Sequence, residues 1–370
     1  MSDETLILDP LPGALQAALE NQTRLVASQQ SDRMQLEFVI ETLLRWDPGD
    51  TVTVAFLGGT SALHKKIADA ALEWTKFGNF KLDFGQSNGS FRTWSPNDTS
   101  YAADIRIGFD RVFQPGYWSL VGRNSVEPNI VGPGGASMNF SNFDLHLPPD
   151  YAATVMHEFG HALGFQHEHA HPTGGCDNEF RWTDDPGYQR TTDAMGQFIA
   201  DALGRQPGIY TVLAGPPNRW PQAKVDHNLR QLPNSNAFML GPFDKLSIMK
   251  YHFPEWMFVR GKDSVCYSGR NLNLSAGDIK GVSLAYPFPD SEVQAMATRR
   301  EQALQQTLTA AEARSHAEAA AMPAGDEYEP ESAAAPRRRG EEGAAAAAPR
   351  SAEALRDIVQ RRLNAYKKKK

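Results

Sequence analysis

The segment from Val155 to His167 constrains the fold more than any other stretch, because the spacing of its polar residues brings their side chains together only if the backbone is helical. It reads Val-Met-His-Glu-Phe-Gly-His-Ala-Leu-Gly-Phe-Gln-His. An α-helix turns by about 100° per residue, so His157 and His161 lie about 40° apart on one face and can bind a single ion. Glu158 falls beside them. The spacing therefore predicts a helix that presents two imidazoles and one carboxylate together.

A third histidine follows after a glycine. His167 comes six residues after His161, and a straight helix would carry it away from the other two histidines. Gly164 permits a sharp turn with positive φ, which brings His167 back. Three imidazoles leave a fourth, open position on a tetrahedral ion, and this ligand set suits Zn²⁺. We therefore predict zinc as the cofactor, with His157, His161 and His167 as its ligands. The alternative, a core helix that carries three histidines by chance, would bury them at high cost.

The rest of the body predicts an α+β domain. One or two leading helices are predicted within residues 11–46, on apolar positions at helical spacing: Leu36, Val39, Ile40, Leu43 and Leu44. Alternating residues predict a strand at 51–57, and a helix follows at 62–77. Further strands are predicted at 81–84, 104–109, 117–121 and 137–140. We expect a twisted mixed sheet with the histidine helix, then a less regular C-terminal subdomain, where prolines interrupt the pattern.

The composition changes beyond Pro289. Residues 291–321 are rich in Ala, Glu, Gln and Arg and predict a helix, whereas 322–350 contain four prolines and an alanine run, which predict a linker or disorder. A last amphipathic helix is predicted at 352–366, and its apolar stripe indicates docking onto a partner or onto the body: Leu355, Ile358, Val359 and Leu363. We expect three parts.

These parts are an N-terminal helical segment (1–48), a catalytic domain (49–290) and a helical and low-complexity tail (291–370). The tail holds 14 Lys and Arg against 12 Asp and Glu, which leaves 23 against 32 in residues 1–290. An acidic body argues against nucleic-acid binding, since neutralising phosphates needs clustered cations. The run from Lys367 to Lys370 is expected to be a solvated end.

Neither a membrane span nor a secretion signal is predicted. Apolar runs such as 51–57 are far shorter than the roughly 18 residues needed to cross a bilayer. The first thirty residues lack a basic stretch followed by a continuous apolar one. We expect the cytoplasm by default, or export by a non-standard route. The two cysteines, Cys176 and Cys266, permit one disulfide, a thiol pair or neither.

At these residues the sequence resembles the metzincins, whose pattern is His-Glu-x-x-His-x-x-Gly-x-x-His followed later by a methionine turn. The stretch Ser247–Tyr251 matches the Ser-Ile-Met-x-Tyr form of the astacin and serralysin branches, and Glu168 fits the astacins. The resemblance covers about residues 50–290. It implies a metzincin-like catalytic domain with Met249 beneath the histidines and Tyr251 reaching the metal.

The chain departs from the astacins after the third histidine. It has His-Ala-His-Pro-Thr-Gly-Gly at 169–175, where astacins carry an Arg and an Asp-Arg-Asp group. No cysteine precedes Cys176, which excludes the thiol-based latency of matrix metalloproteases. Asp47 or Asp50 is a candidate for blocking the metal, and the alternative is that both belong to an Asp-Pro-Gly-Asp turn. We therefore expect a divergent astacin-like metzincin.

The resemblance and the residue types together imply a zinc-dependent endopeptidase that acts on proteins or peptides. Hydrolysis is expected through a zinc-bound water, with Glu158 as the general base and Tyr251 stabilising the oxyanion. One alternative is a zinc-holding pseudoprotease that binds peptides without cutting them; Glu158 disfavours it, because a binder needs no base. The other is a zinc amidase on a small substrate, which the separate methionine turn disfavours.

Seven further histidines have weaker patterns. His169 and His171 follow the motif and are expected to support the site or lie on the surface, because three ligands already complete it. His252, beside Tyr251, is a weak candidate for polarising a substrate carbonyl. The remaining four have no partner pattern and are expected to be structural: His64, His146, His227 and His316.

Overall fold

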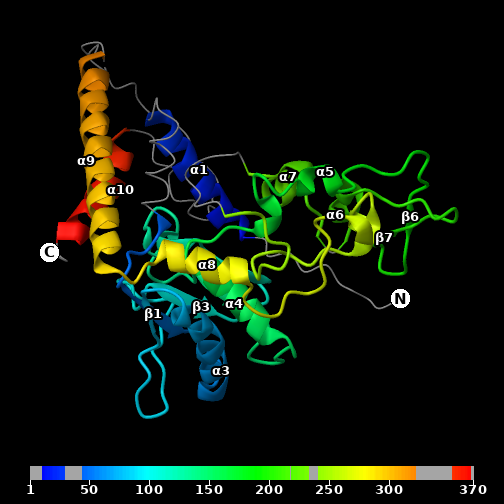
Figure 1. Cartoon of the computed structure of the whole chain (residues 1–370), viewed down its shortest axis with the longest axis horizontal. Helices are drawn as coiled ribbons and strands as arrows, with labels where there is room; N and C mark the ends of the chain where they lie inside the picture. Colours follow the sequence, from blue (N-terminus) through cyan, green and yellow to red (C-terminus); the bar gives the residue numbers. More distant parts are fainter. Residues whose placement is uncertain (1–10, 30–43, 217, 233–240, 322–351, 368–370) are drawn as a thin grey trace, which may run out of the picture.

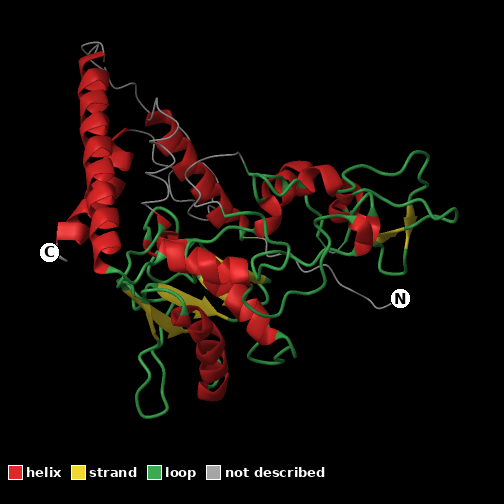
Figure 2. Cartoon of the chain, viewed as in Figure 1, coloured by secondary structure: helices red, strands yellow, loops and turns green. Residues whose placement is uncertain are grey.

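The computed structural model describes residues 11–29, 44–216, 218–232, 241–321 and 352–367. Leu36, Val39, Ile40 and Leu43 of the predicted leading helices, the predicted linker 322–350 and Lys368 to Lys370 lie outside these residues. Figures 1 and 2 show the arrangement of the elements. In chain order they are α1 (Gly13–Gln29), β1 (Thr51–Phe56), α3 (Ser61–Ala71), η1 (Leu72–Lys76), β2 (Lys81–Asp83), β3 (Ile105–Gly108), β4 (Tyr117–Ser119), η2 (Gly122–Val126), β5 (Met138–Phe140), α4 (Tyr151–Ala162), η3 (Glu168–Ala170), α5 (Cys176–Glu179), β6 (Thr191–Thr192), β7 (Phe198–Ile199), α6 (Ile209–Ala214), α7 (Gln222–Leu229), η4 (Glu255–Met257), η5 (Gly261–Asp263), α8 (Ala276–Ala285), α9 (Asp290–Ala321) and α10 (Ala352–Lys367).

The main sheet has five strands in the order β2-β1-β3-β5-β4. The first four run parallel and β4 pairs antiparallel with β5, so the predicted mixed sheet is confirmed. The register sets Val54 opposite Ile105 and Trp118 opposite Asn139. β1 lies inside the sheet and its last residues, Val54 to Phe56, are fully buried. Such continuous burial is typical of parallel strands that are covered on both faces.

Two helices, α3 and α4, pack against each other beside this sheet and share its hydrophobic core (Figure 1). Thr60 is the N-cap of α3, and its Oγ1 accepts a hydrogen bond from the N–H of Leu63 at 3.2 Å. The predicted helix at 62–77 ends as a 3₁₀ turn, η1, in which Trp74 is fully buried. The core therefore fixes α4, the helix with the histidine motif, between α3, η1 and β4.

The C-terminal part of the body is less regular, as expected. Short helices and the small β6–β7 hairpin surround a second apolar cluster, which includes Phe180, Ile209, Leu213, Phe253 and Phe258. In Figure 1 the β6–β7 hairpin lies at the far end from α9. This part and the sheet part are joined by the residues on either side of the third histidine, so the site lies where they meet.

The tail folds back onto the chain. α9 and α10 pack side by side, and α10 also contacts α1 (Figure 1). Ile358, Val359 and Leu363 of the predicted apolar stripe are buried. Of the two alternatives for this stripe, the structure shows docking onto the chain itself. Within the described residues, no helix has the length and apolar character needed to cross a membrane.

Candidate metal site

The helix α4 carries His157, Glu158 and His161 and buries all three. It ends in a Schellman motif: the N–H of Phe165 donates to the carbonyl of Gly160 at 3.0 Å, and the N–H of Gly164 to the carbonyl of His161 at 2.8 Å. Gly164 has φ +101°, a conformation that residues with a Cβ rarely adopt. The turn predicted from the glycine is confirmed.

Three histidines converge in space. The ligand atoms of His157, His161 and His167 all lie within 4.8 Å of one another, and the Nε2 atoms of His161 and His167 are 3.0 Å apart. His157 Nδ1 lies 2.7 Å from the carbonyl of Ile248, and His161 Nδ1 lies 2.8 Å from that of Phe165. A carbonyl only accepts, so both Nδ1 atoms carry the proton and both Nε2 atoms keep a lone pair. This donor set suits Zn²⁺.

The methionine turn lies against the helix. The N–H of Lys250 donates to the carbonyl of Ser247 at 3.1 Å, which closes the turn. A Cβ on Gly160 would collide with the Sδ of Met249, so the glycine leaves room for this sulfur against the helix. The carbonyl of Ile248 in the same turn orients His157. The turn thus supports the position of the ligands, as the resemblance implies.

Asp278 braces the methionine turn, a role that no sequence pattern indicated. Its Oδ1 accepts from the hydroxyl of Ser247 at 2.6 Å, and its Oδ2 accepts from the N–H groups of Ile248 and Ser275, both at 2.8 Å. Ser275 and Asp278 also form a capping box at the start of α8. The Ser-Ala-Gly-Asp spacing at 275–278 is a signal for that box, but it does not reveal a second contact with residues thirty positions earlier.

Three aromatic side chains donate to carbonyls of α4 and the residue after it. Trp74 Nε1 donates to Met156 at 2.9 Å, Trp46 Nε1 to Ala162 at 2.8 Å, and the hydroxyl of Tyr286 to Leu163 at 2.6 Å. The last carbonyls of a helix have no intrahelical partner, so the buried donors of Trp46 and Tyr286 stabilise the end of α4, whereas Trp74 adds a second donor to a carbonyl in its middle. All three contacts span more than eighty positions, which is why the sequence did not indicate them.

Tyr251 lies among the histidines. Its ring stacks on His157, with centroids 5.6 Å apart and an interplanar angle of 18°, and lies 4.2 Å from the ring of His167. His169 stacks on the same tyrosine at 4.9 Å and is itself buried against Phe253. His169 Nε2 lies 3.0 Å from the carbonyl of Asn228. The expected supporting role thus fits His169.

The other candidates lie elsewhere. His171 Nε2 lies 3.0 Å from the carbonyl of Gly241, and His252 Nδ1 lies 3.2 Å from that of Ser268. The carboxylate of Asp47 accepts from Arg300 at 2.9 Å, and Asp50 Oδ2 accepts from the N–H of Asp47 at 3.0 Å. Both aspartates are held in the Asp-Pro-Gly-Asp turn, the second of the two sequence alternatives. Among the described residues, the metal-ligand cluster contains the three histidines alone.

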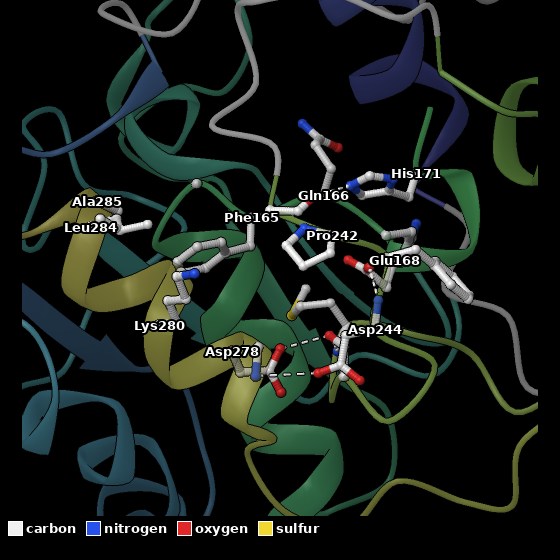
Figure 3. A pocket seen from close by; sticks show the side chains of 18 of the residues that line it. Phe165, Gln166, Glu168, His171, Pro242, Asp244, Asp278, Lys280, Leu284 and Ala285 are labelled. Atoms are coloured by element: carbon white, nitrogen blue, oxygen red, sulfur yellow. Dashed lines mark hydrogen bonds between the residues drawn. The ribbon is translucent and has the colours of Figure 1, made fainter. Parts of the chain in front are cut away.

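A pocket of ≈ 460 Å³ is lined by His167 and by its neighbours Phe165 and Glu168 (Figure 3). Figure 3 shows Glu168, Asp244 and Asp278 along one side and Phe165 across from them. Glu168 Oε1 accepts from the N–H of Asp244 at 2.7 Å, and the N–H of Glu168 donates to the carbonyl of Met249 at 3.0 Å. Burial raises the pKa of Glu168 to about 7. Glu168, the residue after the third histidine, is therefore bonded to the methionine turn and to the segment just before it.

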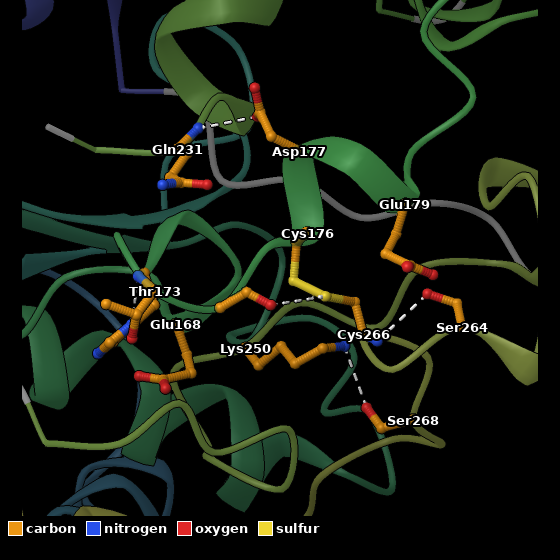
Figure 4. Close-up of a disulfide and its surroundings, with 12 residues drawn as sticks. Glu168, Thr173, Cys176, Asp177, Glu179, Gln231, Lys250, Ser264, Cys266 and Ser268 are labelled. Atoms are coloured by element: carbon orange, nitrogen blue, oxygen red, sulfur yellow. Dashed lines mark hydrogen bonds between the residues drawn. A yellow bond between two sulfur atoms is a disulfide. The ribbon is translucent and has the colours of Figure 1, made fainter. Parts of the chain in front are cut away.

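The two cysteines form a disulfide, which settles the alternatives left by the sequence (Figure 4). Cys176 at the start of α5 is bonded to Cys266, and both are fully buried. Lys250, close by in Figure 4, donates to Ser268 Oγ at 3.1 Å. Burial lowers the pKa of this lysine to about 8. Disulfides persist in oxidising compartments, so the bond favours export over the cytoplasmic default.

Replacing Asp278 by asparagine is expected to loosen the methionine turn, because one acceptor oxygen becomes an NH₂ donor that faces another donor. The free energy of unfolding should fall by roughly 1–3 kcal/mol. Thermal denaturation measures this loss, and chelator competition measures a weaker hold on zinc. Asp263→Asn, at an exposed position, is the matched control. Equal behaviour of the two variants would contradict the bracing role.

Replacing both Cys176 and Cys266 by serine is expected to lower the free energy of unfolding by about 4 kcal/mol, because the bond closes a loop with a sequence separation of 90. Urea unfolding with and without reductant checks this. Reductant should shift the wild-type midpoint to lower urea and leave the double-serine variant unchanged. A wild-type midpoint that ignores reductant would show that the thiols do not pair.

The sequence matches no family model and no curated protein. Two structures of myroilysin are similar to the chain. One shares 27% identity over 66% of this chain and 97% of that chain, with a TM-score of 0.49, and the other shares 26% identity over 66% and 86%, with a TM-score of 0.42.

A third similar structure is high choriolytic enzyme 1, a hatching-enzyme zinc protease from the medaka fish Oryzias latipes. It shares 16% identity over 66% of this chain and 96% of that chain, with a TM-score of 0.38. All these TM-scores are low, so function is inferred from the site itself. In its three-histidine cluster, its glycine turn and its methionine turn, the chain resembles the astacin-like metzincin zinc peptidases.

Proposed function

We propose that the chain is a zinc-dependent endopeptidase in which Glu158 is the general base. The observation that carries this proposal is the convergence of three imidazoles, two of them fixed through Nδ1 on backbone carbonyls. His157, His161 and His167 would hold the ion, and the open fourth position would face the substrate. When bound, zinc supplies Lewis acidity, which polarises a peptide carbonyl and acidifies water.

Glu158 supplies the proton transfer. It follows His157 directly on α4, so its carboxylate lies beside the ligands rather than among them, and its side chain is only 1% exposed. A carboxylate so placed accepts a proton from the attacking water and then delivers it to the leaving amine. A protein that only binds peptides has no use for such a base, which supports hydrolysis over a binding role.

Tyr251 supplies the second catalytic group in this proposal. Its ring is held between His157 and His169 by stacking, so its hydroxyl is carried close to the imidazole cluster. A phenol here can donate a hydrogen bond to the oxyanion of the tetrahedral intermediate. The burial of the ring supports this role, because a fixed donor needs no reorganisation during the reaction.

An extended peptide suits the sheet next to the helix. β4 forms the edge of the five-stranded sheet and contacts α4. An edge strand offers backbone groups to which a substrate can add as a further strand. This supports protein or peptide substrates, which bind along a sheet edge in an extended conformation.

Purified protein is expected to contain about one zinc per chain, with His161→Ala losing most of it and part of its thermal stability. Elemental analysis and thermal denaturation measure both. His227→Ala, on α7 outside the cluster, should keep the metal. Casein digestion should stop when a chelator is added. Full activity of metal-free wild type would exclude a zinc peptidase, and zinc binding without casein cleavage would favour the pseudoprotease or the amidase.

Glu158→Gln and Tyr251→Phe are expected to separate two catalytic roles. Glu158→Gln removes only the base, so zinc should stay bound while kcat falls by about 10²–10⁴. Tyr251→Phe removes one hydroxyl, so kcat should fall on the order of 10²-fold with little change in KM. Steady-state kinetics on a fluorogenic peptide measures both, and Tyr267→Phe is the control for a lost phenol elsewhere. A fully active Tyr251→Phe beside an inactive Glu158→Gln would reduce Tyr251 to packing.

A further inference from the structure

We propose that Arg362 and Arg300 of the tail are positioning residues for the metal-binding helix, acting through Asp47 and Trp46. The effect that we expect on zinc release rests on the proposed function. The proposal assigns a role to two helices that carry none of the three zinc-binding histidines and do not carry the general base. The contacts that carry it start in α9 and α10 and end one residue beyond His161.

The two arginines converge on one carboxylate. Arg300 Nη1 donates to Asp47 Oδ1 at 2.9 Å and to the carbonyl of Trp46 at 3.2 Å. Arg362 Nη2 donates to the same Oδ1 at 3.3 Å and to the carbonyl of Arg45 at 3.1 Å. The arginine side chains are 2% and 5% exposed. Breaking such a buried pair is costly because a charge stays behind in a medium of low dielectric. The backbone at 45–47 is therefore fixed by the tail.

This fixed corner holds the end of α4. Trp46 Nε1 donates to the carbonyl of Ala162, the last residue of the helix, at 2.8 Å. Cγ of Arg45 lies 3.7 Å from the place that a Cβ on Gly164 would occupy, so it covers the turn toward His167. A shift of residues 45–47 would thus uncover both the helix end and the turn. The ligands flanking that turn are His161 and His167, and displacing groups behind metal ligands commonly weakens metal binding or activity about 10–100-fold.

The arginines do not supply the main docking energy of the tail. Apolar side chains on α9 and α10 are buried as well, among them Leu304, Leu308, Ile358, Val359 and Leu363. Burial of such apolar side chains is the main source of docking free energy between packed helices. Replacing one arginine by glutamine should therefore leave the helices docked and loosen the corner at residues 45–47. The neighbouring Arg361 offers a matched control, because its side chain is 46% exposed and pairs with Glu127 instead.

The test compares Arg362→Gln with Arg361→Gln in the full chain. Hydrogen exchange is followed by mass spectrometry on a peptide covering residues 159–168, in which the amides of Leu163, Gly164 and Phe165 close the end of α4. Arg362→Gln should exchange about 10-fold faster there than wild type, with a peptide covering β1 unchanged. Zinc release to a chelator should speed up by about 10-fold. Arg361→Gln should match wild type in both measurements, and Arg300→Gln repeats the test should Arg362→Gln not fold.

A double-variant cycle tests the path through the indole. Trp46→Phe removes the N–H donor, and the double variant with Arg362→Gln should speed exchange at 159–168 by clearly less than the product of the two single effects, because both changes act through the same corner. Additive effects, or an Arg362→Gln variant whose exchange and zinc release equal those of Arg361→Gln, would overturn the proposal. Exchange is measured without substrate, so it decides this inference even where wild type cleaves no peptide and the proposed function fails.

Discussion

The geometry of the site depends on how α4 ends. The chain has to turn at Gly164 while the last carbonyls of the helix stay hydrogen-bonded. His161 precedes the turn and His167 follows it, so any change in the turn moves His167 relative to the other two ligands. Trp46, Tyr286 and the Schellman amides saturate the carbonyls from Gly160 to Leu163. Because these donors are buried and directional, they hold the helix end in one conformation without help from the metal.

A second set of contacts fixes the ligands from the side of the methionine turn. Met249 fills the space that Gly160 leaves open, Ile248 orients His157, and Asp278 binds the turn that contains both. Glu168, which directly follows the third ligand, is hydrogen-bonded to the same turn. The disulfide then ties the chain after His167 to the chain after Tyr251. His157 is thus held by the distant methionine turn, His167 lies against Tyr251 of the same segment, and the residue after His161 is held by Trp46. Such fixed ligands suit a preorganised metal site.

Sequence patterns predicted what depends on local periodicity and missed what depends on distant pairing. The strands around Val54 and Ile107 and the helix with His157 followed from spacing, and so did the positive φ of Gly164, because that is a property of one residue. Trp46, Asp278 and the arginines on Asp47 could not be found this way. Their partners lie 30 to more than 300 positions away, and a single tryptophan or aspartate is compatible with many partners. The disulfide was left open for the same reason.

The contact between Arg362 and the carbonyl of Arg45 joins residues 317 positions apart, and a ribosome delivers them in that order. Residues 45–290 leave the ribosome while this brace has yet to be made. Contacts of such high sequence separation form slowly, because the intervening chain loses conformational entropy before the contact contributes any stability. A nascent chain would therefore lack the contacts of Arg362 with residues 45 and 47 until translation has passed α10, so that maturation of the site is timed by synthesis of that helix.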